Sequence, residues 1–415
     1  MAHKKIIAMA VRVASMGRTV QRLNLVPKPD VRFVQTAWHK GDSIKRLYHA
    51  DNIDVLTALS QDMEVCGHVT LIYIDPPYNT GGTFETRDFK YAYDDRFSIQ
   101  TYLNFMRKRL ELMYNLLSSE GSIYVHLDSN MVFHVKVIMD EIFGMQNFKG
   151  MITRKKCKSK NFTRKTYGNI SDYILFYSKT DEPVWNRPYE EWSDEKVLKE
   201  YPYIEEGTGR CYKKVPIHAP GTRNGASGEP WRGMMPPEGK HWQFTPDKLE
   251  EMDKRGEIYW SQNGNPRRKV YFDQSQGVPV QDIWLDYLDV NNQNTLVTGY
   301  PTEKNIDMLK RIIETSSRPG DLVLDCFAGS GTTLLAAEQL GRQWIGVDIG
   351  DEAIHTIQNR FLNGSRPMGD YVRKKVQIQK PLTLFSDEDF EDGPHKAPKT
   401  DNQAKAISYD MFDER

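Results

Sequence analysis

An apolar run early in the chain ends abruptly in residue types that can do chemistry. Residues 71–74 are Leu-Ile-Tyr-Ile, and they are followed by Asp75, Pro76, Pro77 and Tyr78. The pattern predicts a buried strand with a carboxylate and an aromatic ring at its carboxyl end, where ligands bind in open α/β sheets. Because the two prolines restrict the backbone, the turn should hold Asp75 and Tyr78 in fixed positions.

A second apolar run ends in an acid and a turn that contains glycines. Residues 322–325 are Leu-Val-Leu-Asp, residues 326–333 are Cys-Phe-Ala-Gly-Ser-Gly-Thr-Thr, and a helix is expected over 334–340. Glycines allow the close approach of a ligand to the backbone, and a plain strand-to-helix connection is the alternative. A phosphate-binding loop would need a lysine before the Ser or Thr, and a dinucleotide-binding turn would need a third glycine where Leu334 stands. Both of these familiar motifs are therefore excluded.

Alternating strands and helices must position these turns. Apolar spacing of three and four residues predicts helices over 103–117 and 132–143, and apolar runs predict strands over 122–128, 173–177 and 343–347. The last of these strands ends at Asp348, and an acid about 20 residues after a glycine turn suits ribose hydroxyls. The alternation predicts a doubly wound α/β fold.

Two further strand ends carry polar residues whose roles the sequence leaves open. Asp51 follows a short strand, where it could bind a ligand or cap the next helix. His126 and Asp128 end the strand at 122–128, where catalytic and structural hydrogen-bonding roles are both open.

Composition narrows the class of protein. The chain has 415 residues and a formal net charge of +0, so any affinity for nucleic acid must come from local patches. Its cysteines form no CxxC pair, which predicts no metal site and a reducing, cytoplasmic compartment. No apolar run is long enough to span a bilayer, and a secretory signal is lacking, so we expect no membrane partner.

Two regions are rich in cations. Residues 154–165 hold seven of them, a patch that could grip phosphates or form a solvated loop: Arg154, Lys155, Lys156, Lys158, Lys160, Arg164 and Lys165. Over 180–299 periodicity fades while six of the eight tryptophans occur, which indicates an irregular, separately packed region. Cations there that could contact phosphates and bases are Arg210, Lys213, Lys214, Arg223, Arg232, Arg267, Arg268 and Lys269.

These changes in composition and hydrophobic periodicity divide the chain into five parts. Residues 1–45 form a basic N-terminal extension, for which an organelle transit peptide is the less favoured reading. Residues 46–180 and 300–380 are two halves of one α/β domain, separated by 181–299. Residues 381–415 form an acidic tail that we expect to be flexible.

The two turns together resemble those of the amino-methylating DNA methyltransferases that use S-adenosylmethionine. Asp-Pro-Pro-Tyr at 75–78 precedes Phe-Ala-Gly-Ser-Gly-Thr-Thr at 327–333, an order that resembles the permuted β class. Residues 74–81, 121–128 and 300–304 further resemble the Mod subunits of type III restriction-modification systems. The resemblance implies a Rossmann-like sheet with a catalytic half at 46–180, a cofactor-binding half at 300–380 and a target-recognition region between them.

The resemblance also implies a chemistry. The Asp75 carboxylate and the Pro76 carbonyl would each accept one hydrogen of an exocyclic amino group, which frees the nitrogen lone pair to attack the sulfonium methyl. Tyr78, after Pro77, would stack on a base flipped out of the duplex. The patch at 154–165 would grip the DNA backbone. The cofactor pocket is implied at Asp51, Thr302, Lys304, Asp325, Phe327, Gly329, Gly331, Thr332 and Asp348.

We therefore expect sequence-specific methylation of adenine N6 in double-stranded DNA, in a bacterial or archaeal cytoplasm. Asp before Pro-Pro-Tyr favours adenine in this family, and N4-cytosine methylation is the alternative within the class. A DNA-recognition subunit that has lost catalysis is the alternative of another class, against which the intact Asp75 and Tyr78 speak. The resemblance allows a homodimer or a restriction subunit as partner.

Overall fold

The structure, a computed structural model, describes residues 44–78, 98–158, 165–289, 298, 300 and 303–364. It describes the backbone alone at 33–36, 83–85, 91–94, 296–297, 366–367 and 410–414. The expectations for Thr302, Lys160 and Arg164 and for most of both termini lie outside these residues. Among the described residues, no helix is long and apolar enough to cross a membrane.

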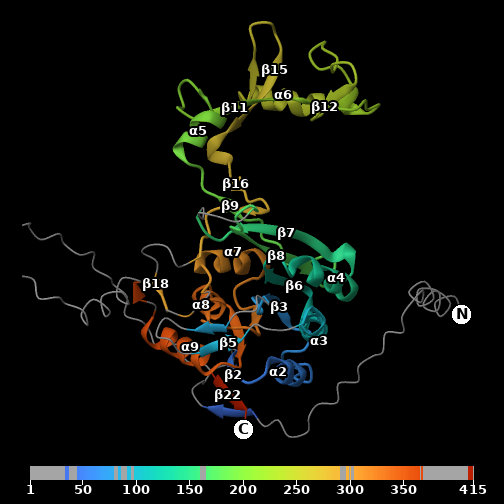
Figure 1. Cartoon of the computed structure of the whole chain (residues 1–415). Coiled ribbons are helices and arrows are strands. Elements are labelled where there is room, and N and C mark those ends of the chain that lie inside the picture. The colour runs from blue at the N-terminus through green and yellow to red at the C-terminus, as the bar shows by residue number, and fades with distance from the viewer. Residues whose placement is uncertain are drawn as a thin grey trace, which may run out of the picture. The chain divides into compact units, whose positions relative to one another are not determined.

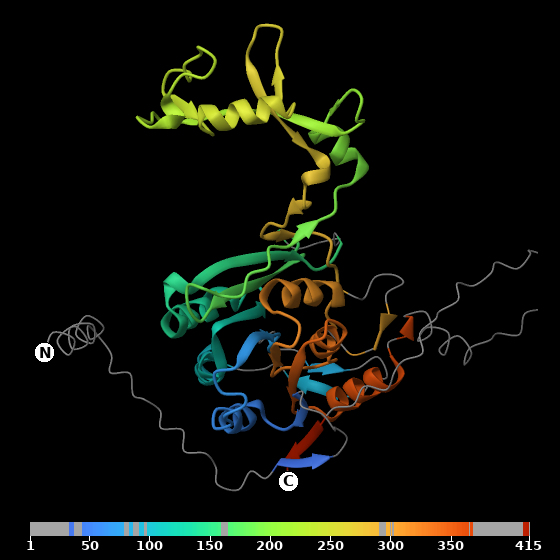
Figure 2. The same ribbon diagram turned by 180° about the vertical axis from the view of Figure 1, so that it is seen from behind.

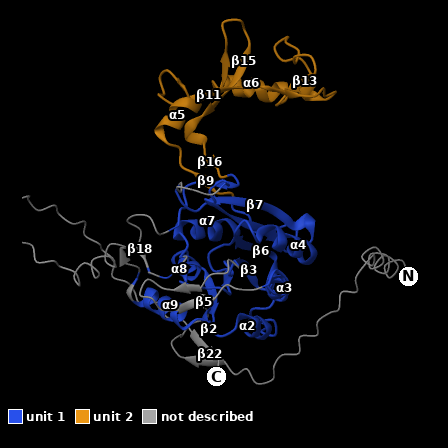
Figure 3. Ribbon diagram, viewed as in Figure 1, with its two compact units in different colours: residues 1–186, 281–415 blue, residues 187–280 orange. Residues whose placement is uncertain are grey.

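The chain folds into two compact units (Figure 3). Residues 1–186 and 281–415 form the first unit, and residues 187–280 form the second. The second unit ends earlier than the sequence suggested, because the returning segment 283–284 pairs with a strand of the first unit at 153–154.

A mixed sheet is the frame of the first unit (Figure 1). The order across the sheet is β1 (Phe33–Thr36), β22 (Asp410–Glu414), β2 (Lys45–His49), β20 (Gln343–Asp348), β19 (Leu322–Asp325), β3 (Val69–Ile74), β6 (Leu117–Leu127), β8 (Ser171–Ser178), β7 (Phe148–Lys155) and β17 (Ile283–Trp284). The five neighbouring strands from β2 to β6 in this order run parallel, whereas β8 runs antiparallel to both β6 and β7.

Two strands that are far apart in the sequence form the centre of this sheet. β3 and β19 are parallel neighbours, with Val69 opposite Leu322 and Ile72 opposite Leu324. Every residue of both strands is buried, which explains why both read as apolar runs. The turns at 75–78 and 326–331 therefore follow at the same carboxyl edge of the sheet.

Helices cover both faces of the sheet, as Figures 1 and 2 show. On one face lie α2 (Asn52–Leu59), α3 (Ile99–Leu116) and α4 (Val132–Phe143), and on the other lie α7 (Ile306–Ser316), α8 (Thr332–Gln339) and α9 (Asp351–Asn363). On α3, Tyr102, Met106 and Leu110 are fully buried, in agreement with the predicted spacing. The predicted doubly wound α/β fold is confirmed, with an antiparallel edge that the sequence did not reveal.

The second unit is built from short elements around a small core of Trp231, Trp242, Leu249 and Ile258. The strands β9 and β16 pair where the chain enters and leaves. The region expected to be irregular thus contains short helices and strands, and these strands are too short to give a periodic signal. Its elements are β9 (Tyr189–Glu190), α5 (Asp194–Glu200), β10 (Tyr203–Ile204), β11 (Cys211–Pro216), β12 (His218–Pro220), η2 (Ala226–Gly228), β13 (Lys240–Trp242), α6 (Pro246–Lys254), β14 (Ile258–Trp260), β15 (Pro266–Tyr271), η3 (Phe272–Gln274) and β16 (Val278–Pro279).

Short pieces complete the first unit. They are η1 (Met145–Asn147), the antiparallel pair β4 (Thr83–Glu85) and β5 (Tyr91–Asp94), and the pair β18 (Leu296–Val297) and β21 (Arg366–Pro367). Within the tail expected to be flexible, Asp410–Glu414 forms β22, which runs parallel to β2. The acidic composition of the tail gave no sign of this strand.

Candidate active site

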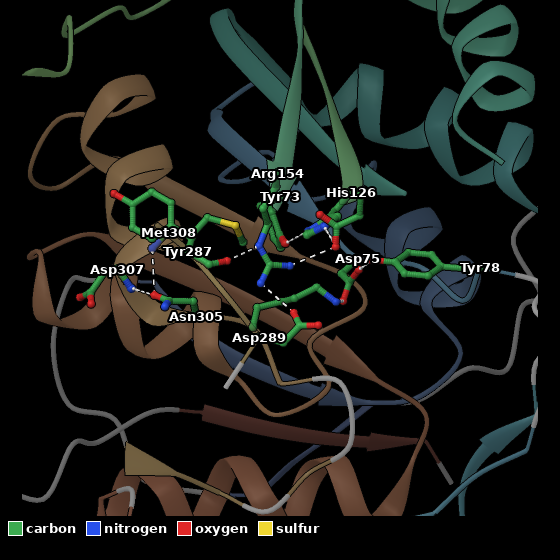
Figure 4. Close-up of polar contacts among 12 residues, drawn as sticks. Tyr73, Asp75, Tyr78, His126, Arg154, Tyr287, Asp289, Asn305, Asp307 and Met308 are labelled. Carbon is green, nitrogen blue, oxygen red and sulfur yellow. Dashed lines mark hydrogen bonds and ion pairs between the residues drawn. The ribbon is translucent and has the colours of Figure 1, made fainter. Parts of the chain in front are cut away.

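The Asp75 carboxylate at the end of β3 is enclosed by polar partners (Figure 4). The Tyr78 hydroxyl donates a hydrogen bond to Oδ1, and the Lys304 ammonium forms an ion pair with Oδ2. The side chains of Lys304 and Asp75 are 10% and 18% exposed, and Pro76 is buried. The structure thus brings Lys304, which the sequence places with the cofactor, into direct contact with the residue predicted to be catalytic.

The Tyr78 ring lies near a cation and a histidine. The Lys304 Nζ is 5.5 Å from the ring centroid, and the His126 ring centroid is 6.3 Å away with an interplanar angle of 40°. Burial and the charge of Asp75 raise the pKa of Tyr78 well above its ordinary value. The hydroxyl therefore stays protonated and acts as a donor to Asp75.

The glycine turn is held between two carboxylates. Oδ1 of Asp325 accepts a hydrogen bond from the backbone N–H of Phe327 at 3.0 Å, and Oδ2 of Asp348 accepts one from Gly329 at 2.8 Å. Gly329 and Gly331 have φ angles of +50° and +71°, in a region of backbone conformation that residues other than glycine rarely adopt. Both glycines are therefore required by the backbone itself.

Negative charge is concentrated at this edge of the sheet. Burial, with the charges of Asp75 and Asp348, raises the pKa of Asp325 to about 7, although hydrogen bonds from Thr333 and Phe327 lower it. Burial also raises the pKa of Asp348. Carboxyl groups with raised pKa values beside a third carboxylate are typical of ligand sites, and they would favour a cationic ligand.

A buried ion pair that sequence reasoning missed connects Lys304 with the glycine turn. The Arg360 guanidinium, on α9, pairs with the neighbour of Lys304, Glu303, at 2.9 Å. It also donates to the Ser330 carbonyl oxygen at 2.9 Å and to the Thr332 hydroxyl at 2.8 Å. In the sequence Arg360 is an ordinary cation near the end of an amphipathic helix, so no local signal could have found it.

Asp51 is the N-cap of α2. Its Oδ1 accepts hydrogen bonds from the backbone N–H of Ile53 at 3.0 Å and from the Arg109 guanidinium at 2.8 Å. The neighbouring Asn52 donates to the carbonyl oxygen of Cys326, at 2.7 Å, which joins α2 to the glycine turn. The capping role that the sequence left open is confirmed, and contact of Asp51 with a cofactor stays a prediction.

The structure separates the two polar residues near the end of β6. The Asp128 carboxylate accepts hydrogen bonds from the backbone N–H groups of Asn130 and Met131, at 3.0 and 2.9 Å, just before α4. Its role is structural. His126 instead faces the interior beside Tyr73 and Asp172.

The prediction that Arg154 grips DNA is wrong. Its side chain is fully buried and donates to Asp172 at 3.0 Å, to Asp289 at 2.7 Å and to the Tyr287 carbonyl oxygen at 2.6 Å. Successive residues of a strand point to opposite faces, so a run of cations can direct one of them inward. In the rest of the patch Lys158 and Lys165 are exposed, and Lys155 and Lys156 are half-buried.

Six of the eight cations named for the second unit fall into two groups, and the other two, Lys214 and Arg268, are half-buried against aromatic rings. Four of them are engaged in ion pairs within the unit: Arg210 with Asp273, Lys213 with Glu200, Arg232 with Glu250, and Lys269 with Glu205. Arg223 and Arg267 are exposed, and no carboxylate of the described second unit pairs with either of them.

Comparison with known proteins identifies the family of this chain. The profile of the DNA methylase family N6_N4_Mtase matches residues 69–359. The type II methyltransferase M.EcaI of Enterobacter cloacae is 50% identical over 318 residues, which cover 77% of this chain and 70% of that protein.

More distant similarities extend to a type III enzyme and a solved structure. The Mod subunit of the restriction-modification enzyme StyLTI of Salmonella typhimurium is 29% identical over 76% of this chain, and the match spans 53% of that protein. The crystal structure of the M1.HpyAVI–SAM complex covers 76% of this chain and 98% of its own, with 16% identity and a TM-score of 0.40.

The family profile spans both turns of the candidate site, from the start of β3 to within α9. It covers well over half of the chain. The chain therefore belongs to the N6/N4 DNA methylase family.

Proposed function

We propose that this protein is a sequence-specific DNA methyltransferase that transfers the methyl group of S-adenosylmethionine to N6 of an adenine flipped out of double-stranded DNA. The proposal depends above all on one observation: Asp75 and the glycine turn follow two neighbouring parallel strands. Membership of the family supplies the reaction class, and Asp before Pro-Pro-Tyr favours adenine over cytosine.

The residues around the glycine turn fit the proposed cofactor. The Asp348 oxygens that bind the N–H groups of Gly329 and Gly350 each keep a lone pair for a ribose hydroxyl. The N-terminus of α8 favours the methionine carboxylate, and the surrounding carboxylates favour the sulfonium charge. We assign to this pocket Asp51, Thr302, Lys304, Asp325, Phe327, Gly329, Gly331, Thr332 and Asp348. When bound, the cofactor supplies an electrophilic methyl group.

Asp75 and Pro76 prepare the amino group for reaction. The exocyclic nitrogen of adenine is a poor nucleophile because its lone pair is delocalised into the ring. Hydrogen bonds to the Asp75 carboxylate and the Pro76 carbonyl draw the nitrogen toward tetrahedral geometry. The lone pair would then form the N–C bond while the S–C bond breaks, the uncharged thioether would leave, and one amino proton would pass to water. Because both Asp75 oxygens already have donors, the amino group must share an oxygen with Tyr78 or Lys304, or displace one of them.

DNA is held by other parts of the chain. Tyr78 is the stacking surface for a base whose extrusion costs about a few kcal/mol. We assign target recognition to the second unit, where the exposed Arg223 and Arg267 can reach phosphates or bases. Lys158 and Lys165, also exposed, are candidates for phosphate contacts from the first unit.

Replacement of the carboxylate tests the proposal. Asp75→Ala should abolish methyl transfer to DNA while cofactor binding, measured by calorimetry, stays largely intact. Asp181→Ala, a change of an exposed acid, is the control and should retain activity. Equal activity of Asp75→Ala and wild type would refute the mechanism. Binding of DNA without any methyl transfer by the wild type would favour the catalytically silent subunit.

A further inference from the structure

A buried histidine lies directly behind the proposed catalytic turn. His126, on β6, is fully buried, and its Nδ1 lies 2.8 Å from the hydroxyl oxygen of Tyr73 on β3. On the other side of the ring, Nε2 approaches Oδ2 of Asp172, on β8, to 3.0 Å. Figure 4 shows Tyr73 and His126 beside Asp75. Three neighbouring strands thus each contribute one polar side chain to a chain of contacts that reaches the turn.

Two of these three side chains have a defined protonation state. Burial raises the pKa of Asp172, but His126, Arg154 and Lys304 lower it more, so the carboxyl is ionised and can only accept. Burial and the charge of Asp75 raise the pKa of Tyr73 well above its ordinary value, so the hydroxyl keeps its proton. Between these two groups lies the His126 ring, with Nδ1 toward the Tyr73 hydroxyl and Nε2 toward the Asp172 carboxylate.

Stability alone does not explain these groups. His126, Arg154 and Asp172 are 0%, 0% and 3% exposed, and apolar side chains of similar volume can often replace a buried ionic cluster without loss of stability. The cluster also lies beside the reaction site. The Lys304 ammonium that pairs with Asp75 contributes to the low pKa of Asp172, so both carboxylates feel the same cation.

We infer that Tyr73, His126 and Asp172 are positioning residues for methyl transfer. Their contacts fix β3 at Tyr73, two residues before Asp75. The His126 ring also lies near the Tyr78 ring, with 6.3 Å between the ring centroids. The carboxylate and the stacking ring therefore keep their alignment when a base enters. Displacement of a reacting group by about 1 Å can lower a rate about 10²-fold, so such a support has a measurable effect. This inference rests on the proposed function.

Arg154 anchors the far end of the chain of contacts. Besides Asp172, it binds Asp289 and the carbonyl oxygen of Tyr287, which belong to the segment 281–289 that returns from the second unit. The polypeptide continues from this segment to Lys304. Arg154 thus holds both the carboxylate behind His126 and the end of this segment at 287–289.

The variant Tyr73→Phe tests the inference with little disturbance, because it deletes one hydroxyl and leaves the ring in place. Tyr124→Phe is the matched control. Tyr124 lies opposite Tyr73 on β6, is 2% exposed, and its hydroxyl lies 2.7 Å from the Ser316 hydroxyl. Both variants lose one buried hydrogen bond from the same pair of strands.

In the full-length protein, Tyr73→Phe should lower kcat for DNA methylation about tenfold, which corresponds to about 1.4 kcal/mol. The KM for DNA and the Kd for S-adenosylmethionine should stay close to wild type. Tyr124→Phe should lose about as much thermal stability as Tyr73→Phe, but its kcat should equal that of wild type. Equal effects of the two variants on kcat, or a loss confined to KM, would overturn the inference while wild-type activity upholds the proposed function. A wild type without methyl transfer would overturn the proposed function itself.

Discussion

The Tyr78 side chain has two parts with separate proposed tasks. Its hydroxyl binds Asp75, and its ring is the stacking surface. Tyr78→Phe should lower kcat/KM for DNA only about fivefold, because it removes one hydrogen bond. Tyr78→Ala should lose a further stacking contribution of about 1–3 kcal/mol. Steady-state kinetics of both variants measures the difference, and equal losses would contradict the stacking role.

Asp325 gives the stability of the free protein a pH dependence. Its pKa of about 7 in the folded state exceeds the ordinary value of 3.8, so between these values the folded state binds more protons than the unfolded state. The stability that this group contributes is complete below about pH 4 and is lost as the pH rises toward 7. Asp325→Asn cannot ionise and escapes this loss.

Thermal unfolding of both proteins tests this expectation. From about pH 5 to about pH 8, the difference in free energy of unfolding should move in favour of Asp325→Asn by on the order of a few kcal/mol. Parallel pH profiles of the two proteins would show that Asp325 is ionised throughout this range.

At the scale of single elements, the penultimate residue of β7, Arg154, is a cation that belongs to the interior. Arg154→Met leaves Asp172 buried without its guanidinium partner and should destabilise the protein by about 3–5 kcal/mol. Lys165→Ala changes an exposed member of the same patch. It should leave the unfolding temperature unchanged and weaken DNA binding, with a salt slope reduced by about 1. A wild-type unfolding temperature for Arg154→Met would contradict the structural role.

The strands whose ends carry candidate site residues were predictable from sequence, whereas the charged contacts between elements were not. β3 and β19 are mostly apolar and buried throughout, with Asp75 directly after β3 and Asp325 at the end of β19, so both strands and their turns could be located. Arg154 was misassigned because its partners Asp172 and Asp289 lie 18 and 135 residues away. A count of cations cannot show which of them meets a buried carboxylate.

The second unit contains both ion-paired and exposed cations. Arg210 makes two hydrogen bonds to Asp273, at 2.7 and 2.9 Å. Arg267, on β15, is exposed. Arg267→Ala should weaken DNA binding and reduce its salt slope by about 1, because one phosphate contact is lost. Arg210→Ala should leave the slope unchanged. Fluorescence anisotropy over a salt series measures both, and equal slopes would contradict this division.

At the scale of the whole molecule, the candidate site joins segments from both ends of the first unit. Asp75 follows β3, the glycine turn follows β19, and Lys304 lies just before α7, so the site forms only when these segments meet in one sheet. Apolar patterning identified each strand but could not show that they are neighbours. That both strands belong to one sheet was implied only by the resemblance to the methyltransferases, and the structure shows in addition that β3 and β19 are direct neighbours.

The central claim is that the Asp75 site methylates adenine N6, and the most direct test is the identity of the methylated nucleoside. DNA is incubated with the full-length protein and S-adenosylmethionine labelled in the methyl group, digested to nucleosides and analysed by mass spectrometry. We predict labelled N6-methyladenine with wild type and none with Asp75→Ala. Labelled N4-methylcytosine as the sole product of the wild type would contradict the claim.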